Sequence, residues 1–394
     1  MHDSNCGSSP LKILLYAPNY LPATRYGGPV RSSHGLARGL VRRGHRVDVV
    51  TTNVDGEGVL DVPVGQVVDM EGVRVRYFPT SAPRRIYYSP EMLAAVESEV
   101  DTYDAVHTNG MFLWPGLAIA RAAVRARKPL FISPRGMLVP EMIAGKSKHI
   151  KRLWIASLER RYLKQASAIH VTSESEADGI RQLGLDLAKV AILPNGVDLP
   201  KDEPSASDVE AEWVGVDRGE RVAFLARLDW TKGLDLAIEA VARHPTATLL
   251  IAGPDQIGLQ SALEKQLVRQ DGSCAGRFVG QLDDQRKWAF LAGADLLLAP
   301  SVKESFGMSV AEALCIGTPV ICTPGVGASS IVERISPGLV VERHPDVLAE
   351  VVKEALLDPT RSAQLGKIAK AMMAEEYGWD AIADRMAALY RQTQ

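Results

Sequence analysis

The fold is decided by one stretch of sequence, Lys303-Glu304-Ser305-Phe306-Gly307-Met308-Ser309-Val310-Ala311-Glu312-Ala313-Leu314. The apolar run 296–299 just before it predicts a buried strand, and the apolar residues after Gly307 recur at helical spacing. The stretch is therefore predicted to be the loop at a strand's carboxyl end, followed by the first turns of a helix. Unpaired amides and the helix dipole favour a negatively charged ligand at such a helix start.

Two glutamates, Glu304 and Glu312, flank these predicted amides. An ionised carboxylate only accepts hydrogen bonds, and its two oxygens match the two hydroxyls of a vicinal diol. Phosphate donors with a diol acceptor on each side suit a nucleotide sugar, with one carboxylate for the ribose and one for the transferred sugar. The alternative, which the spacing alone favours, is a pair of solvated charges at a helix end.

Length and composition indicate a globular protein of two domains. The chain has 394 residues, of which 46% are hydrophobic and 23% charged, and a single core rarely grows to that size. The polar start lacks the apolar core of a signal peptide, and no run approaches the roughly 20 apolar residues of a membrane span. The four cysteines show no Cys-x-x-Cys spacing. We therefore expect reduced thiols and a cytoplasmic protein.

Charge is unevenly distributed along the chain. Residues 1–200 contain 25 Lys and Arg against 19 Asp and Glu, and the remainder contains 20 against 28. A basic first half is consistent with an anionic acceptor or with peripheral contact at an anionic membrane, and equally with chance surface composition. We expect no nucleic-acid partner.

Residues 146–164 form the most basic segment, with seven Lys and Arg against one acid and with apolar residues interspersed. A basic amphipathic helix of this kind can lie on an anionic membrane. The alternative, which we favour from sequence, is a helix packed on the sheet with a charged outer face.

Strands and helices are predicted to alternate along both halves of the chain. The predicted strands are 12–16, 46–51, 73–78, 105–107, 129–133, 168–172 and 190–193 in the first half, and 221–225, 248–251, 277–279, 296–299, 319–322 and 339–341 in the second. Strands separated by helices indicate right-handed crossovers and parallel sheets. We therefore predict an α/β fold of two Rossmann-like, doubly wound parallel-sheet domains facing across a cleft, with a ligand at the strands' carboxyl ends.

A polar stretch rich in proline and serine follows Asp198 and predicts a linker. We place an N-terminal domain at 1–198, a linker region at 199–219 and a C-terminal domain at 220–378.

Two basic residues, Arg227 and Lys232, follow the first predicted strand of the second domain. A guanidinium fork and a compact ammonium are the usual pair for clamping a diphosphate, and they would neutralise the leaving group as its bond breaks. The chain has no Asp-x-Asp metal motif, and its nearest variants, at 55–57 and 69–71, fall in predicted turns or surface loops. We therefore expect no metal ligands and no required cofactor. Read alone, the two residues are more often ordinary surface charges.

The remaining candidates share a place at a predicted strand end. They are Gly27, Gly28, His107, Arg135, Glu174 and Asn195. The two glycines let the backbone approach a phosphate or sugar closely, or they form a simple turn. His107 is placed to contact a sugar hydroxyl, although a lone histidine is more often structural. The last three are candidates for the acceptor side.

Together these residues resemble the retaining glycosyltransferases of family 4, which share the two-domain GT-B fold. The resemblance covers nearly the whole chain, and its most specific motif is the Glu-x-Phe-Gly start with Glu304 and Glu312 separated by seven residues. The other matching positions are Gly27, Gly28, His107, residues 194–198, Arg227 and Lys232. One departure is Ala226, where the family usually has glycine before the arginine.

The resemblance implies a role for each position. Glu312 would bind the ribose hydroxyls and Glu304 the hydroxyls of the donor sugar. Catalytic roles fall on Glu304, His107, Arg227 and Lys232, with the two basic residues on the diphosphate and the histidine on the sugar. Donor binding would be completed by backbone at Phe306, Gly307, Met308, Val279 and Gly280, the last two near the base. The helix at about 379–394 would pack back on the first domain.

The implied activity is that of a metal-independent hexosyltransferase acting with retention. It would move a sugar from a UDP-sugar, or less favourably a GDP-sugar, to a saccharide or lipid-linked saccharide in bacterial polysaccharide or cell-surface glycan synthesis. The first domain would bind the acceptor, in the cytoplasm or at the inner membrane face.

Two alternatives stay open, a sugar-nucleotide epimerase on the same fold and a non-catalytic sugar-nucleotide-binding protein. An epimerase needs ionisable groups at the sugar, and His107 is the one persuasive candidate. The non-catalytic alternative would be favoured by the loss of Glu304, Arg227 or Lys232, all of which are present.

Overall fold

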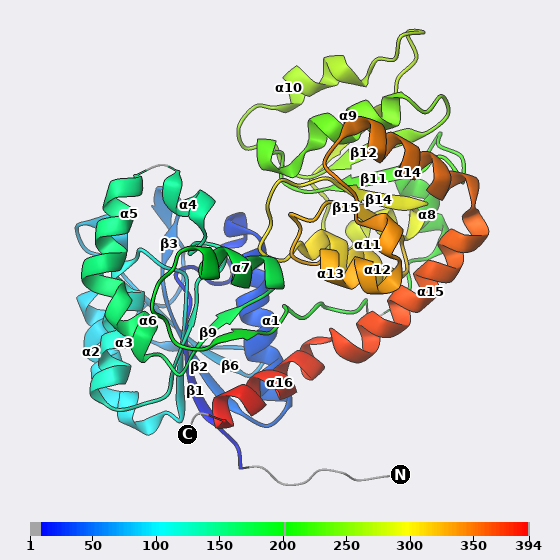
Figure 1. Ribbon diagram of the computed structural model, residues 1–394. Helices are drawn as coiled ribbons and strands as arrows, with labels where there is room; N and C mark the ends of the chain where they lie inside the picture. The colour runs from blue at the N-terminus through cyan, green and yellow to red at the C-terminus, as the bar shows by residue number, and fades with distance from the viewer. Residues whose placement is uncertain (1–8, 146, 201, 393–394) are drawn as a thin grey trace, which may run out of the picture. The chain divides into compact units, whose positions relative to one another are not determined.

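Two compact units make up the chain in the computed structural model, which describes residues 9–145, 147–200 and 202–392 (Figure 1). Unit 1 comprises Met1–Gly196 with Trp379–Gln394, and unit 2 comprises Val197–Gly378. The chain therefore leaves unit 1 once, completes unit 2, and returns to unit 1 through its last helix. None of the described helices is both long and apolar enough to cross a membrane.

Unit 1 is built on an eight-stranded sheet in the order β10-β9-β8-β7-β1-β2-β6-β5. Its strands are β1 (Lys12–Tyr16), β2 (Arg46–Thr52), β5 (Val67–Met70), β6 (Val73–Phe78), β7 (Ala105–Asn109), β8 (Leu130–Ser133), β9 (Ala168–Val171) and β10 (Val190–Ile192). Neighbours run parallel except for the antiparallel edge pair β5 and β6. A small hairpin joins β3 (Val54–Asp55) to β4 (Gly58–Val59).

Helices cover both faces of this sheet (Figure 1). They are α1 (Gly28–Arg42), α2 (Pro90–Glu99), α3 (Trp114–Arg125), α4 (Pro140–Ala144), α5 (Lys148–Trp154), α6 (Arg160–Gln165), α7 (Glu174–Gln182) and α16 (Trp379–Arg391), with the short turns η1 (Thr24–Tyr26), η2 (Arg84–Ile86), η3 (Val100–Thr102) and η4 (Ile155–Glu159). Successive strand residues point to opposite faces, so Leu14 and Tyr16 join the core under α2 and α3. Ile13 and Leu15 join the other core, under α1 and α16.

The last helix, α16, packs tightly on α1. A Cβ on Gly35 of α1 would lie 2.1 Å from Cε2 of Trp379, and one on Gly196 would lie 2.5 Å from Cε3 of the same indole. Only glycine leaves room for this side chain, which is buried together with Met386 and Tyr390. The C-terminal helix expected at about 379–394 thus belongs to unit 1.

Unit 2 is built on a five-stranded, fully parallel sheet in the order β13-β12-β11-β14-β15. Its strands are β11 (Arg221–Leu225), β12 (Thr248–Ala252), β13 (Gly276–Gly280), β14 (Leu296–Ala299) and β15 (Val320–Cys322). Its helices are α8 (Ala206–Glu212), α9 (Leu234–Ala242), α10 (Gln260–Leu263), α11 (Asp284–Gly293), α12 (Met308–Ile316), α13 (Ser329–Ile335), α14 (Pro345–Leu357) and α15 (Pro359–Glu376), with the turns η5 (Trp230–Lys232), η6 (Glu264–Leu267) and η7 (Pro337–Leu339). The predicted fold class, two parallel-sheet α/β domains, is confirmed.

One predicted strand of unit 2, at 339–341, is wrong. The chain there leaves the turn η7 and makes a single bridge between Val340 and Cys322 of β15.

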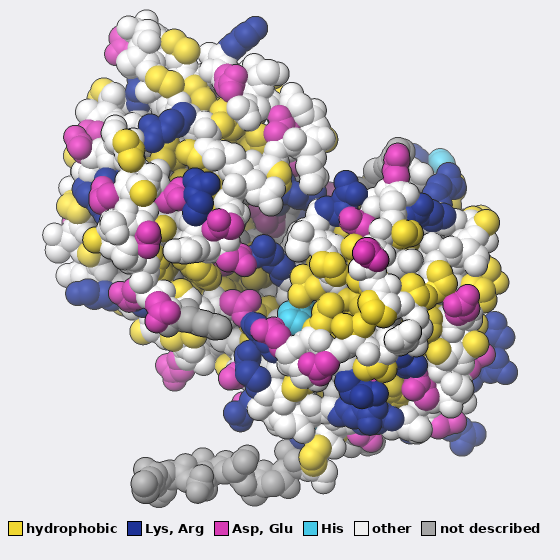
Figure 2. Space-filling model, turned by 180° about the vertical axis from the view of Figure 1, so that it is seen from behind, with side chains coloured by type: hydrophobic (Ala, Val, Ile, Leu, Met, Phe, Trp, Pro, Cys, Tyr) yellow, Lys and Arg dark blue, Asp and Glu magenta, His cyan; other side chains and the backbone are white. Residues whose placement is uncertain are grey.

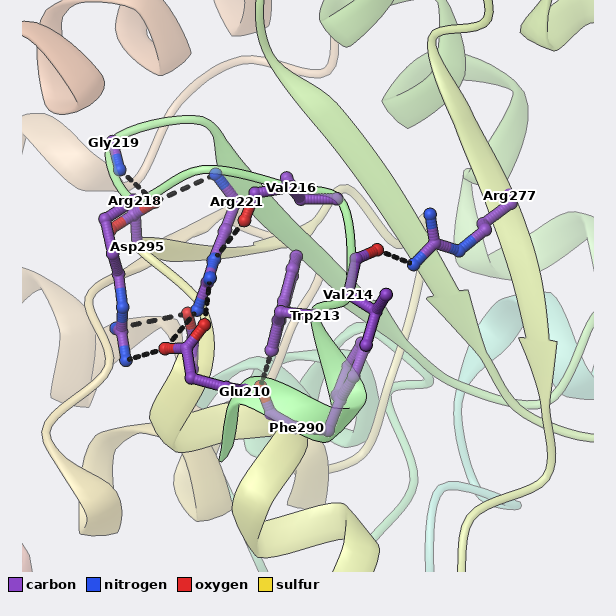
Figure 3. A network of polar contacts seen from close by, with 11 residues as sticks. Glu210, Trp213, Val214, Val216, Arg218, Gly219, Arg221, Arg277, Phe290 and Asp295 are labelled. Carbon is purple, nitrogen blue, oxygen red and sulfur yellow. Dashed lines mark hydrogen bonds and ion pairs between the residues drawn. The ribbon is translucent and has the colours of Figure 1, made fainter. Parts of the chain in front are cut away.

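The described residues of 199–219, predicted as a linker region, belong to unit 2 and are anchored on it. The helix α8 forms within them, and the Trp213 that follows is fully buried and stacked on Phe290 with the ring centres 5.2 Å apart (Figure 3). Glu210 of α8 accepts hydrogen bonds of 2.6 and 3.1 Å from Arg221, the buried first residue of β11. The polar composition of 199–207 masked this anchored segment, for which the large aromatic Trp213 was the available signal.

Candidate functional site

The loop between β14 and α12 forms the centre of the candidate site in unit 2. Gly307 has φ 94°, and a Cβ there would lie 2.7 Å from Cγ1 of Val326, so glycine is required. The loop is held by Glu304 N–H donating to Gly325 O at 2.9 Å and by Gly327 N–H donating to Glu304 O at 3.1 Å. Phe306 is buried below the turn, and α12 begins at Met308. The first amides of α12 have no acceptor within the helix.

Glu304 forms an ion pair with Lys232 at the carboxyl edge of the sheet. Its Oε1 lies 3.0 Å from Lys232 Nζ and accepts a 2.7 Å hydrogen bond from the hydroxyl of Ser301. The two charged side chains are only 15% and 17% exposed. Oε2 accepts no hydrogen bond from the described residues, which leaves half of the carboxylate for a ligand hydroxyl. The structure therefore brings together two of the predicted residues.

Glu312 forms a second, similar pair with a lysine that the sequence reasoning missed. Its Oε1 lies 2.7 Å from Nζ of Lys287 on α11, and the side chains are 15% and 12% exposed. The same ammonium lies 4.8 Å from the centre of the Trp288 ring and 3.4 Å from Asp284. No motif links Lys287 to Glu312 along the chain, because only the packing of α11 beside α12 brings them together.

Arg227 follows β11 and is exposed, with no side-chain hydrogen bond or ion pair among the described residues. Ala226 before it does not adopt a positive φ, so alanine in place of the family's glycine fits the turn. Asp229 caps the turn η5 that carries Lys232, and hydrogen bonds from Thr231, with the charges of Arg227 and Lys232 nearby, lower the pKa of its carboxyl. The loop therefore presents both basic side chains at the strand end.

Val279 and Gly280 end the edge strand β13. Gly280 has φ 77°, and its carbonyl accepts a 2.8 Å hydrogen bond from Gly253 N–H. Because the sheet is fully parallel, this strand end lies on the same edge of unit 2 as the loops that carry Arg227 and Glu304. The predicted donor-side residues of the second domain therefore share one sheet edge.

Gly27 and Gly28 lie where β1 leads into α1, in unit 1. Gly27 has φ 69° with ψ −136°, a conformation that favours glycine. Apart from Gly27 itself and its two chain neighbours, no described residue has an atom within 4 Å of the position of a Cβ on Gly27. Gly28 is the first residue of α1 and is followed by Pro29, so the helix start is open to close approach by a ligand.

His107 is not placed to contact a sugar in this structure, and this expectation is corrected. The side chain is fully buried, with Nδ1 2.7 Å from the hydroxyl of Tyr390 and Nε2 2.8 Å from the hydroxyl of Ser133. Ser133 also contacts Nδ1 of His170, whose Nε2 lies 2.9 Å from Leu193 O. The Leu193 carbonyl can only accept, so Nε2 of His170 donates to it. The hydrogen bonds then run in one direction: Tyr390 donates to His107, His107 to Ser133, and Ser133 to His170. Burial, chiefly, and the nearby His170 and Arg135 lower the pKa of His107.

Arg135 and Asn195, two of the predicted acceptor-side residues, are brought together within unit 1. Nη1 of Arg135 donates to Oδ1 of Asn195 at 2.9 Å, and its Nε donates to Oδ1 of Asn109 at 2.8 Å. Arg135 also has φ 54°, a region that non-glycine residues seldom occupy and that is often found at functional sites. Asn109, at the end of β7, was not singled out from the sequence.

Glu174, the third acceptor-side candidate, lies apart from this cluster. It is exposed on α7 and lies 3.7 Å from Arg181 of the same helix. Its neighbour Glu176 is the buried carboxylate there, accepting 2.9 Å from Thr172 N–H and 2.5 Å from Gly136 N–H. The pattern Ser173-x-x-Glu176 is the sequence signature of a capping box, in which Glu176 N–H donates to Ser173 Oγ at 3.2 Å, and this signal marks Glu176 as the buried glutamate of the pair.

Comparison with known proteins agrees with this geometry. Residues 27–196 match the family "Glycosyl transferase 4-like domain", and residues 211–372 match "Glycosyl transferases group 1". An uncharacterized glycosyltransferase of Methanocaldococcus jannaschii is 26% identical over 97% of this chain and 98% of its own length. A D-inositol 3-phosphate glycosyltransferase of Xylanimonas cellulosilytica is 28% identical over 91% of this chain and 89% of its own.

A solved structure shares the fold. The Anabaena protein HepE, in complex with UDP, aligns with a TM-score of 0.75 at 22% identity over 97% of this chain and 100% of its own. The two family matches together span most of the chain, and each falls on one of the two sheets. The chain therefore belongs to the family 4-type glycosyltransferases of the GT-B fold.

Proposed function

We propose that the protein is a retaining glycosyltransferase whose unit 2 binds a nucleoside-diphosphate sugar and whose unit 1 binds the acceptor. The observation that carries the proposal is the pair of shielded lysine–glutamate contacts, Lys232 with Glu304 and Lys287 with Glu312, on either side of the start of α12. Each carboxylate has one oxygen fixed by a lysine and one oxygen without a hydrogen bond from the described residues. This arrangement suits two diols flanking a diphosphate.

The proposed reaction takes place at the anomeric carbon of the donor sugar. The acceptor hydroxyl attacks from the side on which the diphosphate leaves, so the new carbon–oxygen bond forms as the bond to phosphate breaks. A phosphate oxygen of the leaving group takes the hydroxyl proton, and the configuration is retained. Arg227 and Lys232 would stabilise the charge that builds on the diphosphate. We therefore propose a mechanism without a required metal.

The donor that we propose is a UDP-sugar, with a GDP-sugar as the alternative. Support comes from HepE, which was solved with UDP and with UDP-glucose. We propose a hexose as the transferred sugar and a saccharide or lipid-linked saccharide as the acceptor. The cytoplasm or the inner face of a membrane, in bacterial polysaccharide or surface-glycan synthesis, is the proposed setting. Arg135 and Asn195 are the acceptor-side residues that we propose in unit 1.

The test is the variant Glu304→Gln, which keeps the shape of the side chain and its acceptor for Ser301. We expect release of UDP from a UDP-sugar to fall at least about a hundredfold, as when one transition-state contact is removed. Glu350→Gln is the matched control, because Glu350 is an exposed glutamate of the same unit that pairs with Lys353 of its own helix. Full turnover by Glu304→Gln would remove the assigned role.

A further inference from the structure

The segment 140–165, which contains α4, α5, η4 and α6 between β8 and β9, exposes an unusual set of apolar side chains. They are Met142 (48% exposed), Ile150 (63%), Leu153 (69%) and Leu158 (39%). In the described part of unit 1, every exposed methionine, leucine and isoleucine lies in this segment, and the other large exposed apolar residues there are three valines. Single exposed apolar residues are ordinary, but a group of them marks an interaction surface.

The exposed residues are not the ones that hold the segment on the sheet. That function belongs to Ile143, Ile155 and Leu163, which are at most 5% exposed and belong to the core under α2 and α3. Ile150 and Leu153 are three residues apart on α5, so they lie on adjacent turns of one face. The segment is thus packed on the sheet with exposed charges, as favoured from sequence, and its outer face also carries apolar side chains.

The same segment is strongly basic. Its described residues contain six Lys and Arg against two Glu, and Lys146 lies outside the described residues. Lys148, Arg152 and Arg161 are exposed and have no ion pair among the described residues. Figure 2 shows basic and acidic side chains interspersed over most of the visible face of the molecule.

One of the two acids, Glu159, is turned inward and does not offset this charge at the surface. It is 8% exposed, and its Oε1 accepts a 2.9 Å hydrogen bond from Phe112 N–H, in the loop that follows β7. The π-helical turn η4 (Ile155–Glu159) carries it, and such turns are frequent at functional sites. The exposed segment is thus tied directly to a loop at the carboxyl edge of unit 1, where we place acceptor binding.

We propose that the described residues of this segment, 140–145 and 147–165, are a docking surface for an anionic lipid bilayer. Exposed leucine, isoleucine and methionine would enter the acyl boundary while the unpaired basic residues meet the headgroups, the combination that binds interfacial helices to anionic membranes. Lys164 pairs with Asp186, but Lys148, Arg152 and Arg161 have no ion pair among the described residues, and this positive charge fits an anionic bilayer better than an apolar protein groove. The surface goes beyond the proposed transfer reaction, and it would bring a lipid-linked acceptor to unit 1.

The test is binding of the full chain to sedimented vesicles of phosphatidylglycerol with phosphatidylcholine, compared with phosphatidylcholine alone, without any donor. We expect binding only to the anionic vesicles, weakened by salt. Ile150→Ser and Leu153→Ser should each weaken it about tenfold, from the lost apolar transfer energy. Leu357→Ser, at a leucine of unit 2 that is 71% exposed, is the matched control and should bind as the wild type does.

A second test asks whether vesicle binding depends on the basic residues of this surface or only on the overall charge of the protein. In the triple variant Lys148→Gln, Arg152→Gln, Arg161→Gln, the affinity for anionic vesicles should fall about fivefold for each charge removed. The control triple variant Arg121→Gln, Arg125→Gln, Lys189→Gln removes three other exposed basic residues of unit 1. Its affinity for anionic vesicles should fall only slightly.

Three results of the vesicle assays would overturn the proposal. They are absence of wild-type binding, equal binding to both kinds of vesicle, and equal loss in the two triple variants. Concentration-dependent dimers abolished by Leu153→Ser would assign the surface to a second copy instead and would also overturn it. UDP binding, measured in parallel, reports on the donor site in unit 2, so its failure would count against the proposed function and leave the vesicle result standing.

Discussion

Replacing Lys287 by methionine tests whether this lysine positions Glu312 for nucleotide binding. The change keeps most of the side-chain volume but removes the ammonium that lies 2.7 Å from Glu312 Oε1. The Glu312 carboxylate, which is 15% exposed, would then lose this hydrogen-bonded partner of opposite charge. Hydrogen bonds to charged groups contribute about 1.5–3 kcal/mol, so we expect the free energy of unfolding to fall by about 2 kcal/mol.

The same variant should bind UDP about tenfold more weakly, because a freely rotating carboxylate must be ordered when it holds the ribose diol. Calorimetry with UDP and 2′-deoxy-UDP measures this, and the wild type's preference for UDP should shrink in Lys287→Met. The matched control is Lys353→Met, since Lys353 pairs with Glu350 at 3.2 Å with both side chains more than half exposed. Such surface pairs contribute at most about 1 kcal/mol, and UDP affinity should not change.

A double-mutant cycle completes the test. If Lys287 acts on UDP binding through Glu312, the loss of UDP-binding free energy in the double variant Glu312→Gln, Lys287→Met should be smaller than the sum of the losses in the two single variants. Additive effects, or a Lys287→Met variant that behaves like Lys353→Met in both assays, would refute the positioning role.

Three further outcomes follow from the packing and the charges. Gly307→Ala should lower the free energy of unfolding by about 1–3 kcal/mol in urea titration and weaken UDP binding, because alanine is strained in the left-handed region that Gly307 occupies; unchanged binding would separate the turn from the site. Tyr390→Phe removes the donor to buried His107 and should lower the free energy of unfolding by about 1–3 kcal/mol while leaving UDP affinity intact, whereas a weaker UDP affinity would restore His107 to the donor site. Burial raises the pKa of Glu159 to about 7 from 4.5, so the folded state binds its proton more readily than the unfolded chain does. Its contribution to stability is therefore greatest at low pH and declines as pH rises from about 4.5 to 7; Glu159→Gln should flatten that decline in urea titrations at pH 5, 6 and 7.5, and an unchanged slope would contradict the assignment.

Much of the fold was predictable because strands and helices of a parallel α/β domain each leave a local pattern of apolar residues in the sequence. Short apolar strands alternating with helices specified two doubly wound units, and the glycine of the Glu-x-Phe-Gly loop marked a strand-to-helix turn. Composition was a weaker guide than packing. The polar stretch after Asp198 resembled a linker, yet Trp213 anchors it in a core.

A contact in the candidate site could be predicted only where both of its residues lie in recognisable sequence motifs. Glu304 and Lys232 were selected separately, and the fold places them 3.0 Å apart. Lys287 could not be found, since nothing along the chain connects it with Glu312. His107 shows the opposite limit: a position at a strand end does not reveal which face the side chain takes, and in this fold it faces the core beneath α16.

The most direct test of the central claim is calorimetric titration of the full chain with UDP, GDP, ADP and NAD in the presence of EDTA. We expect UDP to bind without a metal, and we expect Arg227→Ala to weaken this binding about tenfold or more through loss of a charge-assisted contact to phosphate. Binding of NAD alone, or UDP binding that EDTA abolishes, would contradict the central claim.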